Sequence, residues 1–154
     1  MANTYTQIHL HLIFAVQNRR SLIKKSWKDR LYEYITGIVQ QHTHKMISIN
    51  GMPDHLHIVI GMRPTQSLSE LMQDIKGNSS KWINHNKIVA GKFQWQESYG
   101  AFSYGKSQLP KLIEYVKNQE DHHKKKIFLE EYKDFLNAFE VEYDERYIFK
   151  EMED

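Results

Sequence analysis

The chain has 154 residues, of which 40% are hydrophobic and 12% aromatic, and its formal net charge is only +2. This length suits one hydrophobic core, so we expect a single domain over residues 1–154, with a core over about 5–121 and an acidic C-terminal helix and tail over about 127–154. The absence of cysteine excludes disulfides and thiolate metal sites and agrees with a reducing cytoplasm. Neither a signal peptide nor an apolar run of membrane-spanning length is found, so we expect a cytoplasmic protein with no membrane partner.

The small net charge conceals an uneven distribution along the chain. Residues 1–126 contain 18 Lys and Arg against 9 Asp and Glu, a net charge of +9, whereas residues 127–154 contain 3 against 10, a net charge of −7. A body this basic favours a polyanionic ligand whose binding weakens as salt rises. We expect the acidic segment to lie away from that ligand or to pack on another subunit. An unevenly charged surface without any ligand would give the same numbers.

The first half of the chain predicts a strand, a helix and a hairpin. Apolar residues alternate with polar ones from Gln7 to Val16, which is typical of a strand, and recur at helical spacing from Trp27 to Val39. Met46–Asn50 and His55–Met62 are two β-rich runs. The Gly, Pro and Asp of residues 51–54 suit a tight turn between them.

The second half predicts a helix, a strand and two further helices. Ser67–Glu70 fits a capping box at the start of a helix, and a last strand is expected within Gln94–Tyr104. Helices are then expected from about Ser107 to His122 and over Phe128–Phe139. The order β-α-β-β-α-β predicts an α+β, ferredoxin-like antiparallel sheet with helices on one face, extended by C-terminal helices.

Two histidines on the predicted strand after the turn form a candidate metal site. Successive side chains of a strand alternate between faces, so His55 and His57 point the same way with Cα atoms about 6.5 Å apart. Two imidazoles, a third protein ligand and a water or phosphate oxygen can complete a Lewis-acid site. His9 and His11 have the same spacing on the first strand, so spacing alone does not choose between the pairs. Both pairs can share the open face of the sheet, with His11 supporting the metal ligands, or be ordinary polar residues there.

Tyr115 and Gln119 lie one turn apart on the predicted helix over 107–122, beside its apolar stripe. A phenol in this place can attack a phosphorus atom while the amide oxygen binds the metal that polarises the phosphate. Boundary packing with the hydroxyl in water is the alternative for a tyrosine here.

These motifs together resemble the single-tyrosine transposases of small bacterial insertion sequences, which belong to the HUH endonuclease superfamily and include the repeat-associated tyrosine transposases. The matching parts are Met52–His57 followed by an apolar strand, and Tyr115 with Gln119 on a later helix. Size and element order also agree, so the resemblance covers residues from about 5 to 121.

The resemblance implies a reaction, a cofactor and partners. His55, His57 and Gln119 would bind a divalent metal, Mg²⁺ or Mn²⁺, and Tyr115 would be the nucleophile that cleaves and rejoins single-stranded DNA at insertion-sequence ends through a 5′-phosphotyrosine. Relatives recognise DNA hairpins and work as homodimers, in which the tyrosine helix of one subunit can complete the metal site of the other. Gly105 would then be a pivot for this exchange, or else an ordinary turn glycine.

Basic residues offer the DNA a path, although each of them also suits a plain surface position. The candidates are Arg19, Arg20, Lys24, Lys25, Lys76, Lys81, Lys106 and Lys111. Trp95, Tyr99 and Phe102 can stack on bases or pack in the core. For His122–Lys126 we expect phosphate contacts and not a metal site, because the lysines would repel a cation.

Three alternatives remain open at this stage. A domesticated relative that cuts repeated palindromic DNA would share the chemistry. A non-catalytic nucleic-acid-binding module would use only the sheet and the basic helices, and its binding would not respond to a chelator. A metal-dependent hydrolase of small phosphates would not need Tyr115.

Overall fold

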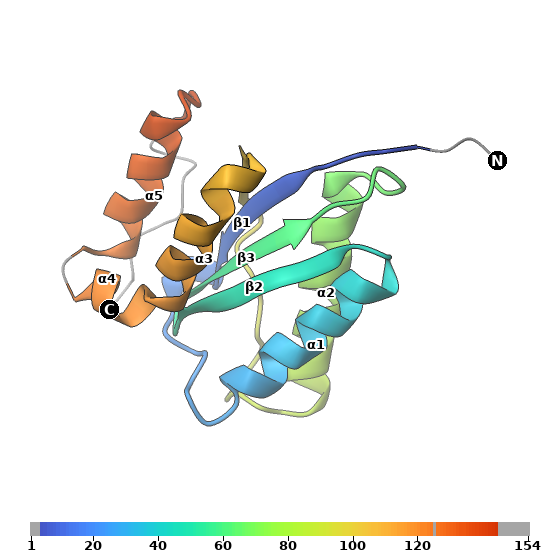
Figure 1. Ribbon diagram of the computed structural model, residues 1–154. Helices are drawn as coiled ribbons and strands as arrows, with labels where there is room; N and C mark the ends of the chain where they lie inside the picture. Colours follow the sequence, from blue (N-terminus) through green and yellow to red (C-terminus); the bar gives the residue numbers. More distant parts are fainter. Residues whose placement is uncertain (1–3, 125, 145–154) are drawn as a thin grey trace.

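The sheet has the strand arrangement that the sequence predicts. The computed structural model describes residues 4–124 and 126–144 (Figure 1). The strands are β1 (His9–Ala15), β2 (Lys45–Met52), β3 (His55–Gly61) and β4 (Gly100–Tyr104). They pair in the order β2-β3-β1-β4, and every neighbouring pair is antiparallel. This arrangement confirms the α+β, ferredoxin-like fold.

Two helices, α1 (Lys28–Gln41) and α2 (Leu68–His85), cover one face of this sheet (Figure 1). The alternation along β3 turns Leu56, Ile58 and Ile60 towards them, and all three are completely buried. The predicted cap of α2 is present, since the Ser67 hydroxyl accepts a hydrogen bond from the Glu70 N–H. Within the described ranges, no helix combines the length and the apolar composition that crossing a bilayer requires.

The opposite face of the sheet, expected to be open, is covered by α3 (Leu109–Lys117), α4 (Gln119–His123) and α5 (Phe128–Ala138). The reason is that this face is also apolar. Ile13, Ala15 and Phe102 pack against α5, and Val59 packs against α3. The expectation of helices on one face therefore holds for α1 and α2, while the extra C-terminal helices enclose the face that carries the histidines.

The helix expected over residues 107–122 is divided into three pieces. A 3-10 turn over Lys106–Gln108 precedes α3, and α3 ends at Lys117, because the next residue, Asn118, has a ψ of 28° that departs from the helical value before α4 begins. The Asn50 side chain donates hydrogen bonds to the carbonyls of Val116 and Lys117. Those carbonyls would otherwise accept hydrogen bonds from the next helical turn. The contact with β2 therefore ends α3 and fixes the position of Gln119, the first residue of α4.

Two glycines near the site have different reasons for their places. A Cβ on Gly51 would lie 2.2 Å from the carbonyl oxygen of His55, so the hairpin needs glycine there. Gly105 has φ −77° and ψ 158°, an extended conformation that any residue adopts, and its N–H donates to the Gln108 side chain. The backbone at Gly105 thus gives no support to the predicted pivot.

Candidate active site

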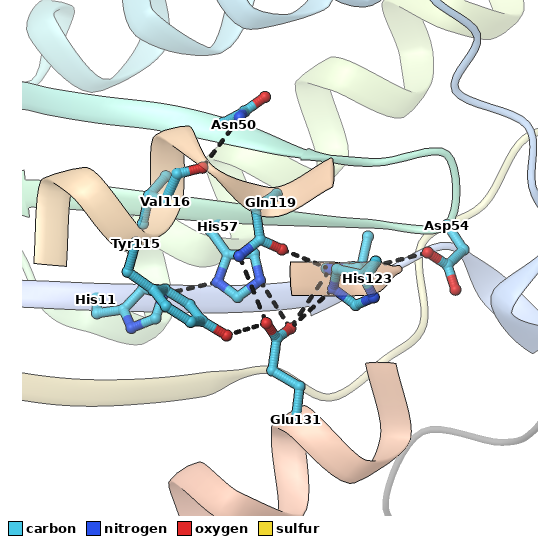
Figure 2. Close-up of polar contacts among 10 residues, drawn as sticks. His11, Asn50, Asp54, His57, Tyr115, Val116, Gln119, His123 and Glu131 are labelled. Atoms are coloured by element: carbon cyan, nitrogen blue, oxygen red, sulfur yellow. Dashed lines mark hydrogen bonds and ion pairs between the residues drawn. The ribbon is translucent and has the colours of Figure 1, made fainter. Parts of the chain in front are cut away.

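Strand alternation brings the two histidine pairs of the sequence to one face, as expected. His55 and His57 on β3 are completely buried, and β1 runs beside them. Nε2 of His11 lies 2.8 Å from Nδ1 of His57 (Figure 2). His11 therefore supports His57 from behind, which is the supporting role considered for it on sequence grounds.

The carboxylate of Asp54, the preceding residue, orients the His55 ring. Its Nδ1 donates to the Asp54 carboxylate at 2.7 Å, which leaves Nε2 to point into the site. Burial alone would raise the pKa of Asp54, but the hydrogen bond and charge of His55, with Arg19 nearby, hold it below its ordinary value. Both imidazoles on β3 thus have one nitrogen occupied and the other available.

Tyr115 reaches the same place from α3. Its hydroxyl donates a short hydrogen bond to Oε2 of Glu131, and its ring lies 6.0 Å from the His57 ring and 4.4 Å from that of His122, measured between centroids. Burial, together with the charge and hydrogen bond of Glu131, raises the pKa of Tyr115 far above its usual range. The phenol is therefore protonated in the chain as it stands.

Gln119 is completely buried at the start of α4 and also faces the histidines. Its Oε1 lies 3.3 Å from Nε2 of His55, and its Nε2 donates to Oε2 of Glu131 at 3.4 Å. The four residues that the sequence analysis selected, His55, His57, Tyr115 and Gln119, are thus brought together in a single chain.

Glu131 was not expected at this site, because the acidic segment that contains it was predicted to lie away from the ligand or on another subunit. Instead α5 places its carboxylate at the centre of the cluster (Figure 2). Oε1 of Glu131 lies 3.1 Å from Nε2 of His57, 3.3 Å from Nε2 of His123 and 3.6 Å from Nε2 of His55. A sequence signal existed, since Glu131 shares the apolar stripe of Phe128, Tyr132 and Phe135 at helical spacing.

His123 is the second residue whose place at the site was not expected, and it faces the cluster although a lysine follows it in sequence. Lys124 is exposed and pairs with Asp121 at 3.5 Å, so its charge is directed to solvent while His123 turns inward. A helix separates neighbouring side chains onto different faces, so the charge beside a residue in sequence need not be near its side chain.

The electrostatics of the cluster centre on the carboxylate. Burial alone would raise the pKa of Glu131, but hydrogen bonds from His123 and His57 and the charges of the imidazoles hold it far below its usual range. Burial lowers the pKa of His57, and burial with the nearby His57 charge lowers that of His11. A buried carboxylate ion facing imidazole nitrogens is an arrangement that a cation stabilises.

The donor atoms fit a metal ion. His55, His57, His123 and Glu131 offer one ligand atom each, and these atoms all lie within 4.8 Å of one another. Imidazole nitrogens and a carboxylate oxygen are ordinary ligands of divalent cations in proteins. The cluster can therefore hold a divalent ion beside the Tyr115 hydroxyl.

The predicted DNA-binding residues are spread over both faces of the molecule. Lys76 and Lys81 lie on α2, on the far face from the cluster, and the Lys76 ammonium donates to the carbonyls of Glu97 and Ser98, each at 3.0 Å. Burial lowers the pKa of Lys76 to about 8. Lys76 therefore braces a loop of the fold.

Arg19 is not on the surface, where a plain DNA contact would lie. It is 7% exposed, its guanidinium lies 5.7 Å from the centre of the Phe128 ring, and its Nε and Nη1 are buried without hydrogen-bond partners. Lys25 is exposed and pairs with Glu120. The remaining candidates, Arg20, Lys24, Lys106 and Lys111, are exposed.

The three candidate stacking aromatics are mostly used in packing. Trp95 is 7% exposed and Phe102 is 3% exposed, and each lies in an apolar cluster. Tyr99 is half-buried beneath the Lys76 ammonium. The core-packing alternative therefore holds for Trp95 and Phe102.

Comparison with known families identifies the kind of protein to which this fold and cluster belong. A family model described as "Transposase IS200 like" matches residues 4–119, which include His55, His57, Tyr115 and Gln119. The chain belongs to the family of IS200-like transposases. The family points to a DNA-processing enzyme, and α5, with Glu131, lies beyond the matched segment.

Individual relatives of this IS200-like transposase agree with the assignment. The ISDra2 transposase TnpA of Deinococcus radiodurans is 24% identical over 121 residues, which is 75% of this chain and 86% of that protein. A crystal structure assigned as a transposase from Deinococcus radiodurans R1 has the same fold, with a TM-score of 0.62 and 20% identity over 77% of this chain and 95% of that one. A REP-associated tyrosine transposase bound to a REP hairpin gives a TM-score of 0.61 and 13% identity over 80% and 73% of the two chains.

Proposed function

We propose that this transposase cleaves and rejoins single-stranded DNA at the ends of an insertion sequence, with Tyr115 as the nucleophile. The observation that carries the proposal is the contact between the Tyr115 hydroxyl and Glu131, whose other carboxylate oxygen faces the histidines. A phenol is here directed at a cluster that suits a cation, which is the juxtaposition that attack on a phosphodiester requires.

The reaction uses the residues as follows. The Tyr115 oxygen forms a bond to phosphorus as the bond to the 3′ oxygen breaks, giving a 5′-phosphotyrosine and a free 3′ hydroxyl. A second 3′ hydroxyl later displaces the tyrosine, so the bond energy is kept and no nucleotide cofactor is needed. A divalent metal, Mg²⁺ or Mn²⁺, held by His55, His57 and Gln119, would neutralise phosphate charge and lower the phenol pKa, which burial and Glu131 raise.

The surroundings of Tyr115 suggest how a strand approaches. Tyr115 lines two cavities of about 380 and 480 Å³, and Phe135 lines both as well. Lys111 lines the larger of these cavities, and Lys106 lies just before α3. Basic residues beside a tyrosine suit a phosphate backbone, and the hairpin bound by the REP-associated relative makes a DNA hairpin the substrate that we propose.

We also propose a homodimer, the assembly that the family resemblance implies. Tyr115 meets the histidines of its own chain, so the site does not need a second copy for its assembly. Exchange of tyrosine helices between subunits would then be a step of strand transfer.

A covalent trap tests the nucleophile. The protein is incubated with Mn²⁺ and labelled single-stranded DNA carrying the hairpin end of its own element, and adducts are resolved on a denaturing gel. Wild type and Tyr99→Phe, a control on the opposite face, should form an adduct that Tyr115→Phe does not. An adduct that persists in Tyr115→Phe would remove the assignment.

The same assay separates two of the alternatives, and the genomic surroundings separate the third. A non-catalytic binding module would bind the strand with or without chelator and cut nothing. A hydrolase of small phosphates would survive Tyr115→Phe and show no preference for DNA. A domesticated palindrome endonuclease would cut, and would differ in lacking hairpin-bearing ends beside its gene.

A further inference from the structure

Two of the four residues of the metal-binding cluster, His123 and Glu131, lie in the segment beyond the family match. The matched residues end at Gln119, whereas His123 lies on α4 and Glu131 on α5. The Glu131 side chain is 5% exposed and that of His123 is 10% exposed, so both have been taken out of water to meet the histidines of β3. Burying a carboxylate among imidazoles costs free energy unless a cation or proton offsets it.

The hydrogen-bonding directions around His55 point to the same need. Its Nδ1 donates to Asp54, so in the neutral ring Nε2 carries a lone pair. That nitrogen faces two further acceptors, Oε1 of Gln119 at 3.3 Å and Oε1 of Glu131 at 3.6 Å. In the neutral ring the lone pair of His55 Nε2 therefore faces the lone pairs of these oxygens, and a metal ion bound by His55 Nε2 and Glu131 Oε1 removes that repulsion.

The spacing of the donor atoms favours four protein ligands around one ion. With metal–nitrogen and metal–oxygen bonds of about 2.0–2.1 Å, neighbouring ligands of a tetrahedral site lie about 3.3–3.4 Å apart. Oε1 of Glu131 lies at 3.1, 3.3 and 3.6 Å from the Nε2 atoms of His57, His123 and His55. These distances bracket the tetrahedral value, so the carboxylate is already at ligand distance from all three imidazoles.

We propose that His123 and Glu131 join His55 and His57 as ligands of one divalent transition-metal ion. This inference rests on the proposed function and revises its metal site: it keeps the two histidines of β3 and replaces Gln119 as a ligand. Three imidazoles and a carboxylate suit Zn²⁺ best and Mn²⁺ less strongly, and both better than Mg²⁺, which prefers oxygen ligands and keeps several waters. Gln119 then acts beside the ion by donating to Oε2 of Glu131, the oxygen that also accepts the Tyr115 hydroxyl.

A consequence of this ligand set is that the ion connects α5 to the sheet. His55 and His57 come from β3, His123 from α4 and Glu131 from α5. A ligand that binds only the folded state raises its stability, so the ion should raise the melting temperature of the whole chain.

The test is metal binding by the intact protein, without DNA. Isothermal titration calorimetry with MnCl₂ and with MgCl₂, and the melting temperature with each ion, are measured for wild type, Glu131→Gln and Asp134→Asn. Asp134 is the control, because it is an exposed carboxylate on the same helix that pairs with Lys126. Wild type should bind one Mn²⁺ per chain at least about tenfold more tightly than Mg²⁺. Glu131→Gln should lose more than about 100-fold in Mn²⁺ affinity, beyond the roughly 10–100-fold that loss of an outer-shell partner costs, and Asp134→Asn should stay within twofold of wild type.

The outcomes distinguish this inference from the proposed function. If His57→Ala abolishes Mn²⁺ binding while Glu131→Gln retains wild-type affinity, the larger ligand set is wrong and the two-histidine site stands. If wild type binds neither ion, the four-residue ligand set and the two-histidine metal site are both wrong. The nucleophile is tested separately, because an adduct that forms in wild type and is lost in Tyr115→Phe still supports Tyr115. Should Glu131→Gln not fold, His123→Asn replaces it, and unchanged Mn²⁺ affinity in that variant would equally overturn the proposal.

Discussion

Lys76 illustrates how a basic residue that suits DNA on sequence grounds can serve the fold. Its ammonium is directed into the molecule, where it bonds the carbonyls of Glu97 and Ser98 and lies 5.7 Å from the centre of the Tyr99 ring. Such a lysine holds the loop before β4 against α2. Its ammonium hydrogens are used in these bonds and are not directed at a phosphate.

Replacing Lys76 should therefore change stability and not DNA binding. Lys76→Met removes hydrogen bonds from a charged donor to the backbone carbonyls of Glu97 and Ser98, and we expect a loss of roughly 1–3 kcal/mol in the free energy of unfolding. Chemical denaturation measures the loss, and electrophoretic mobility shift with single-stranded DNA measures binding. A DNA affinity that falls as far as in Lys111→Met would contradict the bracing role.

The pH dependence of this effect follows from the direction of the pKa shift. Lys76 has a pKa of about 8 in the folded chain against 10.5 in the unfolded chain, because burial disfavours its charge. Between these values the unfolded chain binds more protons, so the folded state should gain stability as pH rises from about 8 towards 10.5. Denaturation at several pH values should show this gain in wild type and its absence in Lys76→Met.

Some active-site residues could be predicted from the local sequence pattern, and others depend on contacts between distant segments. The alternation along residues 55–60 was enough to predict that His55 and His57 share a face, because side-chain direction on a strand is a local property. Glu131 and His123 could not be assigned in this way. Their role depends on how α4 and α5 fold back onto the sheet, and on sequence grounds one acid on an apolar stripe and one histidine among lysines have several uses.

At the scale of elements, the docking of α5 on the sheet depends on a close approach to β4. A Cβ on Gly100 would lie 2.8 Å from the hydroxyl oxygen of Tyr132 and 2.9 Å from its Cε1. The missing side chain of Gly100 therefore lets α5 lie close enough for Glu131 to reach the histidines.

Gly100→Ala should loosen α5 while leaving the rest of the fold in place. We expect a cost of roughly 1–3 kcal/mol from overpacking, together with faster amide hydrogen exchange in α5 and weaker Mn²⁺ binding. Gly77→Ala is the matched control, since its Cβ would meet nothing within 4 Å in the middle of α2, and it should gain roughly 0.5–1 kcal/mol. Unchanged exchange in α5 of Gly100→Ala would show that this contact does not position the helix.

The elements themselves were largely predictable, and the exception has a long-range cause. Period-two and helical patterns predicted β1 and both helices of the first layer within a few residues, and β-rich runs around a turn predicted β2 and β3. Strand β4 lies within the wider range, Gln94–Tyr104, in which a last strand was expected. The break at Asn118 was not predicted, because it depends on Asn50, which is distant in sequence and bonds the last carbonyls of α3 from β2. No local pattern around residue 118 contains that information.

For the whole molecule, the uneven charge makes a prediction about salt. Residues 1–126 carry a net charge of +9, and the exposed candidates near the tyrosine helix are Lys106 and Lys111. Affinity for single-stranded DNA should fall as salt rises, and Lys111→Met should lower the slope of log affinity against log salt by about 0.7, the value for one phosphate contact. Lys81→Met, on the opposite face, should leave the slope unchanged. Equal slopes in all three proteins would mean that Lys111 does not contact the strand.

Strand β3 divides its residues between two tasks, with Leu56, Ile58 and Ile60 in the core beneath α1 and α2 and His55 and His57 on the other side. A hairpin that paired one residue out of register would turn every side chain of β3 over. The leucine and isoleucines would then face the tyrosine, and the imidazoles would enter the apolar layer. Slippage would therefore remove the two imidazoles from the metal cluster as it disturbs the core, so metal binding would report that the hairpin is paired in the correct register.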